Sequence, residues 1–191
     1  MGVAPVEPMS GWEAMLATWR DLDVPEGYRA EISEGVIRMN PPPAGKHSIT
    51  ASIMHWVLRS NAPPGVEVFQ TVAVEIAGAE KLYVPDTVAA PVKSIRDDGT
   101  VPSPDVLIVV EITSKSTATT DRQEKLLGYA EGSVPAYLLI DRVRSSGPTL
   151  TLYTDPVSGE YQHVVQVPFG EPLTLPDPFG LDLDTAEFPV D

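Results

Sequence analysis

The sequence lacks cysteine, is poor in basic residues and contains no apolar run long enough to cross a membrane. Without cysteine, neither a disulfide framework nor a thiolate zinc site can form. A cysteine-free chain also fits a reducing compartment. The N-terminal segment shows no signal-peptide pattern. These absences together predict a soluble, cytoplasmic protein with no membrane partner.

Motifs of several common enzyme classes are absent as well. The sequence has no phosphate-binding P-loop and no glycine-rich dinucleotide motif. The hydroxyl-rich segment 113–120 contains no nucleophile elbow, and no histidine lies near it in the sequence. The pattern therefore disfavours nucleotide-dependent enzymes and serine hydrolases.

The scarcity of basic residues bears directly on nucleic-acid binding. The 191 residues include 13 Lys and Arg against 27 Asp and Glu, for a net charge of −14. Because proteins bind DNA largely by neutralising phosphates, this balance argues against tight non-specific binding. The charge is uneven, however: no Lys or Arg follows Arg144, and the first 144 residues have a net charge of only −6. A nuclease is not excluded, since bound metal would offset some of the acidic side chains.

Length and periodicity predict one domain over residues 1–191, with 1–9 as a loose arm and 168–191 as a proline-rich, acidic C-terminal segment. Helices are predicted at 10–20, with Ser10 as N-cap, at 46–58, and at 120–131, with Thr120 as N-cap and Gly132 as the stop. Strands are predicted as hairpins at 28–39 and 149–167 and singly at 66–76, 82–90, 105–112 and 136–140. This order indicates an α/β (mixed α+β) fold with a central mixed sheet flanked by helices.

Asp86 is the first candidate for chemistry. Within the predicted strand 82–90 it shares a face with Val84 and Val88, which are apolar. Pro85 cannot donate a ladder hydrogen bond, which indicates a strand edge or a bulge there. The ordinary interpretation is an aspartate that bonds nearby amides.

Glu111 is the second candidate, because it ends the apolar run 106–110. It could simply reach solvent or an arginine. An ionised carboxylate in a dry site nevertheless needs a partner. Asp86 and Glu111 together would find the simplest one in a hard divalent cation such as Mg²⁺.

Two lysines compete for the role of a cation beside such a metal. Lys125 follows Asp121 by four residues, and the ordinary interpretation of that spacing is an exposed helical ion pair. The functional interpretation is a positive charge that stabilises developing charge on phosphate oxygens. Lys115 is the rival because it is close to Glu111 in the sequence.

Two further residues are weaker candidates. His47 opens a predicted helix, and a histidine at a helix start is most often a surface residue. Glu31 lies in the first predicted hairpin and could support the metal ligands as a neighbouring carboxylate. Glu34 and Gly35 are most simply the residues of the hairpin turn.

Several of these motifs occur together in a known family. The sequence has V-P-D at 84–86, P-D-V-L-I-V-V-E-I-T-S at 104–114, D-R-Q-E-K at 121–125, Y-A-E-G-S-V-P-A-Y at 129–137 and I-D at 140–141. In this order they resemble the Uma-two family of putative restriction endonucleases, which falls in the PD-(D/E)XK nuclease superfamily. The similarity extends upstream through Glu31, the prolines at 41–43 and His47.

The resemblance implies a restriction-endonuclease-like fold and a Mg²⁺- or Mn²⁺-dependent enzyme that hydrolyses DNA phosphodiester bonds. It implies Asp86 and Glu111 as metal ligands and Lys125 as the catalytic lysine. Thr113 stands where the superfamily pattern places that lysine. The resemblance therefore favours Lys125, on the following helix, over Lys115. A catalytically inactive interaction module and a hydrolase of smaller phosphate esters remain alternatives, and the sequence leaves open whether the chain forms a homo-oligomer.

Overall fold

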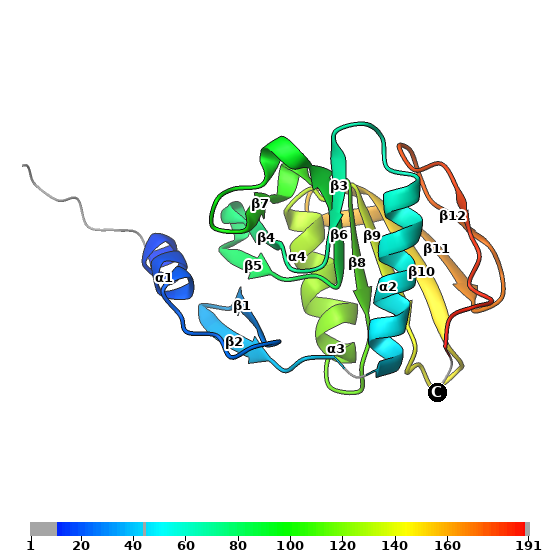
Figure 1. Ribbon diagram of the computed structural model, residues 1–191, viewed down its shortest axis with the longest axis horizontal. Coiled ribbons are helices and arrows are strands. Elements are labelled where there is room, and N and C mark those ends of the chain that lie inside the picture. Colours follow the sequence, from blue (N-terminus) through cyan, green and yellow to red (C-terminus); the bar gives the residue numbers. More distant parts are fainter. Residues whose placement is uncertain (1–10, 44, 190–191) are drawn as a thin grey trace, which may run out of the picture.

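The computed structural model describes residues 11–43 and 45–189 and contains two large β-sheets with helices between and beside them (Figure 1). One sheet has six strands in the order β11-β10-β9-β8-β6-β3, and the other has five in the order β2-β1-β5-β4-β7. A short third sheet pairs β12 with β13. The predicted mixed α/β class is confirmed.

The six-stranded sheet provides the main core. Its strands are β3 (Val66–Phe69), β6 (Thr87–Pro91), β8 (Ile108–Ile112), β9 (Ala136–Asp141), β10 (Thr149–Val157) and β11 (Glu160–Pro168). Only β8 and β9 run parallel among its neighbouring pairs. A parallel pair needs a crossover, and here it is the helical segment 118–131.

The two faces of β8 are covered by different elements. Ile108, Val110 and Ile112 pack in a core cluster with α2 (Gly45–Ser60) and the C-terminal segment. Val109 belongs to a second cluster, with Tyr129 of α4 (Leu126–Glu131) and residues of the five-stranded sheet. Burial on both faces explains the continuous apolar run of this strand. Strand alternation directs Glu111 to the side of Val109, toward the other sheet.

The five-stranded sheet consists of β1 (Arg29–Ser33), β2 (Val36–Asn40), β4 (Ala73–Ile76), β5 (Lys81–Tyr83) and β7 (Thr100–Pro102). The predicted β1–β2 hairpin is confirmed, and its turn residues Glu34 and Gly35 have φ values of 54° and 68°. Two such residues match the type I′ turn that joins tightly paired strands. Leu16 of α1 (Gly11–Arg20) packs against Ile32 and Leu82 of this sheet. The predicted N-cap Ser10 and the arm 1–9 lie outside the described residues.

Two predicted strands are wrong in the same way. The predicted strand 82–90 is split into β5 and β6, which belong to different sheets, and the chain crosses between the sheets at residues 84–86. The predicted strand 66–76 is likewise split into β3 and β4. Each crossing contains a buried apolar residue, Val72 in one and Val84 in the other, so the hydrophobic pattern continues through both. Asp86 therefore lies at a junction between sheets and not inside a strand.

The predicted helix 120–131 is present but begins earlier and is not uniform. It comprises α3 (Ala118–Thr120), a π-helical turn η4 (Asp121–Lys125) and α4, which ends at Glu131, before Gly132, as predicted. Thr120 has helical backbone angles, so its predicted role as N-cap is wrong. Single π-turns inside α-helices are frequent at functional sites.

Three of the connections contain short 3-10 turns, which are η1 (Ala77–Ala79), η2 (Val92–Ser94) and η3 (Ser103–Asp105). Because Asp105 belongs to η3, β8 begins at Ile108, three residues later than predicted.

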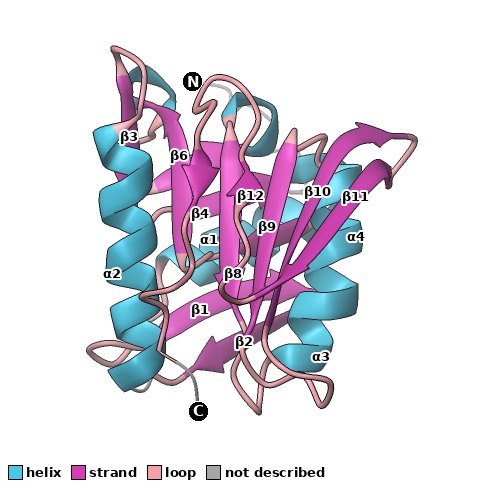
Figure 2. Ribbon diagram, turned by 90° about the vertical axis from the view of Figure 1, so that its right-hand side faces the viewer, coloured by secondary structure: helices cyan, strands magenta, loops and turns pink. Residues whose placement is uncertain are grey.

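The C-terminal segment crosses the face of the six-stranded sheet that α2 also covers (Figure 2). It contains β12 (Leu173–Thr174) and β13 (Asp182–Leu183) and buries Leu175, Phe179 and Phe188 in the core cluster of α2. No helix in the described part of the chain has the length and apolar character needed to span a bilayer.

Candidate active site

All seven residues singled out in the sequence line a single cavity of about 670 Å³. They are Glu31, His47, Asp86, Glu111, Lys115, Asp121 and Lys125. The cavity is assembled from β1 of one sheet, β8 of the other, the crossing at Asp86, the start of α2 and the π-turn η4. The sequence thus identifies residues that long-range folding brings together.

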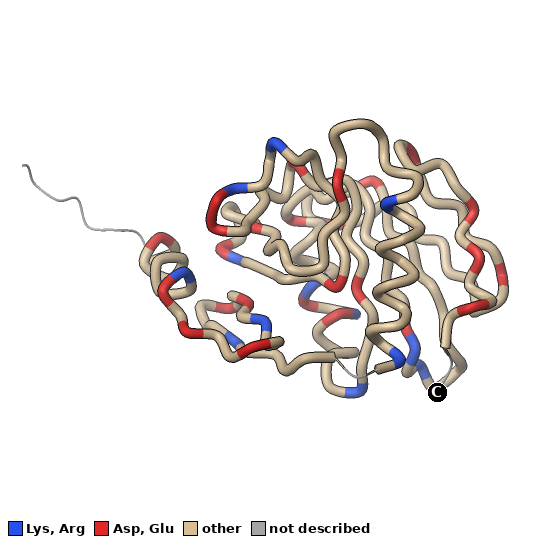
Figure 3. Tube along the Cα trace, viewed as in Figure 1, with Lys and Arg blue, Asp and Glu red and all other residues tan. Residues whose placement is uncertain are grey.

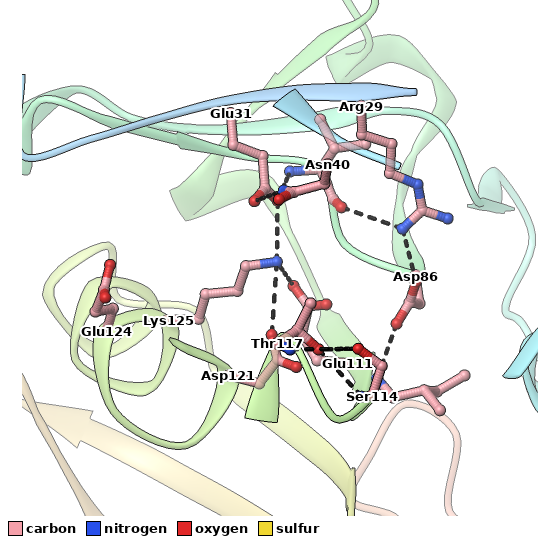
Figure 4. A network of polar contacts seen from close by, with 12 residues as sticks. Arg29, Glu31, Asn40, Asp86, Glu111, Ser114, Thr117, Asp121, Glu124 and Lys125 are labelled. Carbon is pink, nitrogen blue, oxygen red and sulfur yellow. Dashed lines mark hydrogen bonds and ion pairs between the residues drawn. The ribbon is translucent and has the colours of Figure 1, made fainter. Parts of the chain in front are cut away.

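Lys125 lies among three carboxylates, as Figure 4 shows. Its Nζ is 2.8 Å from Glu111 Oε1, 2.9 Å from Glu31 Oε1 and 3.8 Å from Asp121 Oδ1. The π-turn carries both Asp121 and Lys125, and both are buried. The predicted Asp121–Lys125 pair exists, but its interpretation as an exposed surface pair is wrong.

Asp86 is bound by donors from three directions. Its Oδ1 accepts a hydrogen bond from Arg29 NH1 at 2.6 Å, and its Oδ2 accepts one from the backbone N–H of Ile112 at 2.8 Å. His47 Nε2 lies 3.0 Å from the same Oδ2. Although burial alone would raise the pKa of Asp86, His47 and Arg29 hold it below its ordinary value. Asp86 is therefore an ionised carboxylate.

Glu111 is held by two donors on one oxygen. Tyr129 donates its hydroxyl to Glu111 Oε1 at 2.8 Å, the same oxygen that Lys125 contacts. Tyr83 is packed edge-on against Tyr129, with ring centroids 5.4 Å apart, and its ring lies 5.7 Å from Lys125 Nζ. These tyrosines fix the position of the Glu111–Lys125 pair from the side of the core.

Burial and neighbouring charges change the pKa values of Glu111, Asp121 and Lys125 in this cavity. Burial raises the pKa of Glu111 to about 8, and the neighbouring Asp121, Asp86 and Glu31 add to the effect of burial against the opposing influence of Lys125. Burial likewise raises the pKa of Asp121 to about 6. Lys125 has a pKa well above its ordinary value, because its carboxylate neighbours outweigh burial, so it stays protonated. Burial therefore favours the protonated forms of Glu111 and Asp121, while Lys125 keeps its positive charge.

The buried carboxyl oxygens of this cavity are the type of ligand that a hard divalent cation prefers. Mg²⁺ commonly uses only one or two protein carboxylates and completes its shell with water and substrate phosphates. Asp86 and Glu111 are carboxyl groups that line the same cavity. Among the described residues there is no group of three or more His, Asp or Glu side chains that could hold a metal ion. The described residues therefore form no closed cage for a metal ion.

The sequence matches a family model over residues 16–186, and that model is described as Uma2, "Putative restriction endonuclease". The chain belongs to the Uma2 family. The fold of this Uma2 chain is also similar to a crystal structure described as a putative nuclease belonging to DUF820 from Anabaena variabilis ATCC 29413. The TM-score is 0.68 at 21% sequence identity, and the match covers 95% of this chain and 97% of that one. No curated protein matches the sequence.

Some site residues of this Uma2 chain have surroundings that differ from those that the sequence indicated. His47 is only 8% exposed and contacts Asp86, so its interpretation as a surface residue is wrong. Lys115 is exposed and lines the cavity without the buried surroundings of Lys125. Arg29 and Tyr129 were missed, since nothing in their local sequence indicates contact with a carboxylate 57 or 18 residues away.

Proposed function

We propose that this Uma2 protein is a Mg²⁺- or Mn²⁺-dependent endonuclease that hydrolyses DNA phosphodiester bonds. The observation that supports it best is the buried Lys125 between Glu31 and Glu111, in the same cavity that Asp86 lines. Asp86 and Glu111 would hold the cation. When bound, a divalent cation lowers the pKa of a water molecule and polarises the scissile phosphate.

The protein side chains perform three tasks in this proposal. Lys125 supplies a permanent positive charge for the phosphate oxygens as their charge increases. Arg29 and the N–H of Ile112 orient Asp86, while Tyr129 orients Glu111. Burial of these groups strengthens each interaction, because the cavity has a lower dielectric than water.

The distribution of basic residues favours a polyanionic substrate in spite of the net charge of −14. Five of the 13 Lys and Arg residues line this one cavity: Arg29, Lys46, Lys115, Lys125 and Arg142. Figure 3 shows basic segments near the beginning of α2 and acidic segments along the C-terminal part of the chain. Positive charge at the cavity and negative charge elsewhere would direct a DNA backbone to the site.

The first test is cleavage of plasmid and single-stranded DNA with Mn²⁺ by the wild type and by Glu111→Gln. Glutamine keeps the shape of the side chain but cannot provide the charge that a metal ligand needs. We expect metal-dependent cleavage by the wild type and a loss of at least about 100-fold in the variant. Asp86→Asn should behave alike, and Trp56→Ala, on the exposed side of α2, should cleave as the wild type does.

The alternatives give different results in the same experiment. An interaction module with this fold would cleave neither DNA nor a small phosphodiester such as bis-p-nitrophenyl phosphate. A hydrolase of small phosphate esters would act on the small diester alone and lose that activity in Glu111→Gln. Either result would refute the proposal of a DNA endonuclease.

A further inference from the structure

A second cavity adjoins the candidate active site across the side chain of Arg29. It has a volume of about 410 Å³ and is lined by residues of α1, the start of β1 and the crossing after β5. Arg29 and Val84 line both cavities, so these two residues separate them. Since Arg29 also donates to Asp86 at 2.6 Å, the second cavity begins one side chain away from a proposed metal ligand.

The walls of the second cavity are aromatic and apolar, unlike the cationic walls of the first. Trp19, Val24, Tyr28 and Ala30 line it. The indole Nε1 of Trp19 donates to the carbonyl of Ala30 at 2.8 Å, which holds the ring in place against β1. Tyr28 is 42% exposed, so part of its side chain is available for contact. Rigid aromatic side chains beside a phosphate site are typical of stacking platforms for bases.

The polar groups of this cavity suit an uncharged, hydrogen-bonding ligand. Arg20 and Asp98 lie at its edge as an ion pair, with Arg20 Nε 2.8 Å from Asp98 Oδ2, and Thr71 lines it too. Because the pair is neutral overall, the cavity has no strong attraction for a second phosphate. It does offer donors and acceptors to the edge of a planar heterocycle.

We infer that the second cavity binds one unpaired nucleobase of the DNA strand whose phosphate enters the active-site cavity. This inference rests on the proposed function. A base inside a duplex is stacked on both sides and cannot reach such a cavity unless it leaves the stack. The substrate class is therefore DNA that is single-stranded or locally unpaired beside the scissile phosphate.

The first test compares Tyr28→Ala with Tyr28→Phe in binding to a fluorescent oligothymidylate of about eight nucleotides. Fluorescence anisotropy is measured with Ca²⁺ in place of Mn²⁺ so that the strand is not cleaved. We expect Tyr28→Ala to bind about tenfold more weakly, because a stacking surface is removed. Tyr28→Phe keeps the ring and should bind as the wild type does. Trp56→Ala, an aromatic residue exposed on α2, is the matched control and should bind equally well. Equal affinity of Tyr28→Ala and the wild type would overturn the inference.

A second test detects the base directly and does not depend on cleavage. The chain has three tryptophans, so a Trp12→Phe, Trp56→Phe variant leaves Trp19 as the sole tryptophan, which is excited selectively at wavelengths that tyrosine does not absorb. We expect oligothymidylate to quench Trp19 fluorescence and an abasic phosphodiester strand of equal length to leave it unchanged. Equal quenching by both strands, or none by either, contradicts a base in this cavity.

The two proposals can fail separately. Metal-dependent cleavage without base-specific quenching retains the nuclease and removes the base subsite. Base-specific quenching in a protein that cleaves no DNA retains the subsite and removes the hydrolytic function.

Discussion

The ammonium of Lys125 lies 2.8 Å from Glu111 Oε1 at a position where the two side chains are 7% and 3% exposed. A lysine buried this deeply among acidic side chains is expensive to remove, because their negative charge is left uncompensated. Lys125 therefore contributes to stability as well as to the proposed chemistry, and the variants must separate the two.

Lys125→Met should abolish metal-dependent DNA cleavage, with a loss of at least about 100-fold. It should also destabilise the fold by about 3–5 kcal/mol, since the carboxylates around it lose their cation. Lys115→Met removes an exposed charge at the same cavity, and its cleavage rate should fall by less than about tenfold. Cleavage rates and denaturant unfolding of both variants are compared. The assignment of Lys125 over Lys115 is wrong if Lys115→Met loses more activity.

A Lys125→Met, Glu111→Gln double variant checks the stability argument. Neutralising Glu111 removes part of the uncompensated negative charge, so the double variant should be more stable than Lys125→Met alone. Additive losses in unfolding free energy would show that the two residues do not interact.

The metal-free protein should become less stable as the pH rises between about 4.5 and 8. The pKa of Glu111 is raised to about 8, against an ordinary value of 4.5, so the native state binds more protons than the unfolded state in this range. Stability therefore falls with increasing pH, by about 1.4 kcal/mol for each pKa unit. Urea unfolding in EDTA at several pH values measures the decline.

Glu111→Gln is the control for this pH dependence and should show a flatter profile. Addition of Mn²⁺ should stabilise the wild type more at pH 8 than at pH 6, because the cation competes with the proton for the carboxylate. A wild-type profile in EDTA that is flat over this range would contradict the raised pKa of Glu111.

Asp141 should show the opposite pH dependence. Arg122 Nε and NH2 each lie 2.8 Å from its oxygens, and with Thr113 they hold the pKa of Asp141 below its ordinary 3.8 in spite of burial. Its contribution is present above about pH 3.8 and is lost as the pH falls through the lower folded-state value. Asp141→Asn should lower the free energy of unfolding by about 1.5–3 kcal/mol at pH 7.

The difference between Asp141→Asn and the wild type should shrink when urea unfolding is repeated at pH 3. Asp155→Asn is the matched control, since Asp155 is largely exposed beside His163, and it should change stability little at either pH. An Asp141→Asn deficit that is the same at both pH values would argue against the ionic contribution.

Gly128→Ala should disturb the site from the core. A Cβ at this position would lie 2.7 Å from Cε2 of the Tyr83 ring, and Tyr83 contacts both Tyr129 and Lys125. Overpacking of this kind costs about 1–3 kcal/mol. Thermal unfolding and cleavage are measured beside Gly78→Ala, where nothing lies within 4 Å of the new Cβ. Equal stability of the two variants would show that Tyr83 moves aside freely.

Much of the site was predictable because its residues have unusual local surroundings. Glu111 stands out as a carboxylate after an apolar run, and Asp86 stands out behind Pro85. The preference for Lys125 over Lys115 required the family resemblance, since the spacing of Lys125 from Asp121 is also that of an ordinary surface pair.

The remaining features depend on contacts between distant segments. Arg29 reaches Asp86 only because β1 pairs with β5, a pairing that the single predicted strand 82–90 obscured. The local sequence around Tyr129 predicts only a core residue of an amphipathic helix. The π-turn at η4 changes the hydrogen bonding of a helix whose sequence pattern remains that of an α-helix.

Because the chain crosses between the two sheets at Asp86, residues of both sheets line the cavity. Glu31 and Arg29 come from one sheet and Glu111 from the other, while Lys125 bridges them from the helical connection. Neither sheet alone carries all of the residues that we propose for catalysis. Any change that loosens the packing of one sheet against the other should abolish activity while each sheet keeps its own hydrogen bonds. During unfolding, activity should therefore be lost before secondary structure.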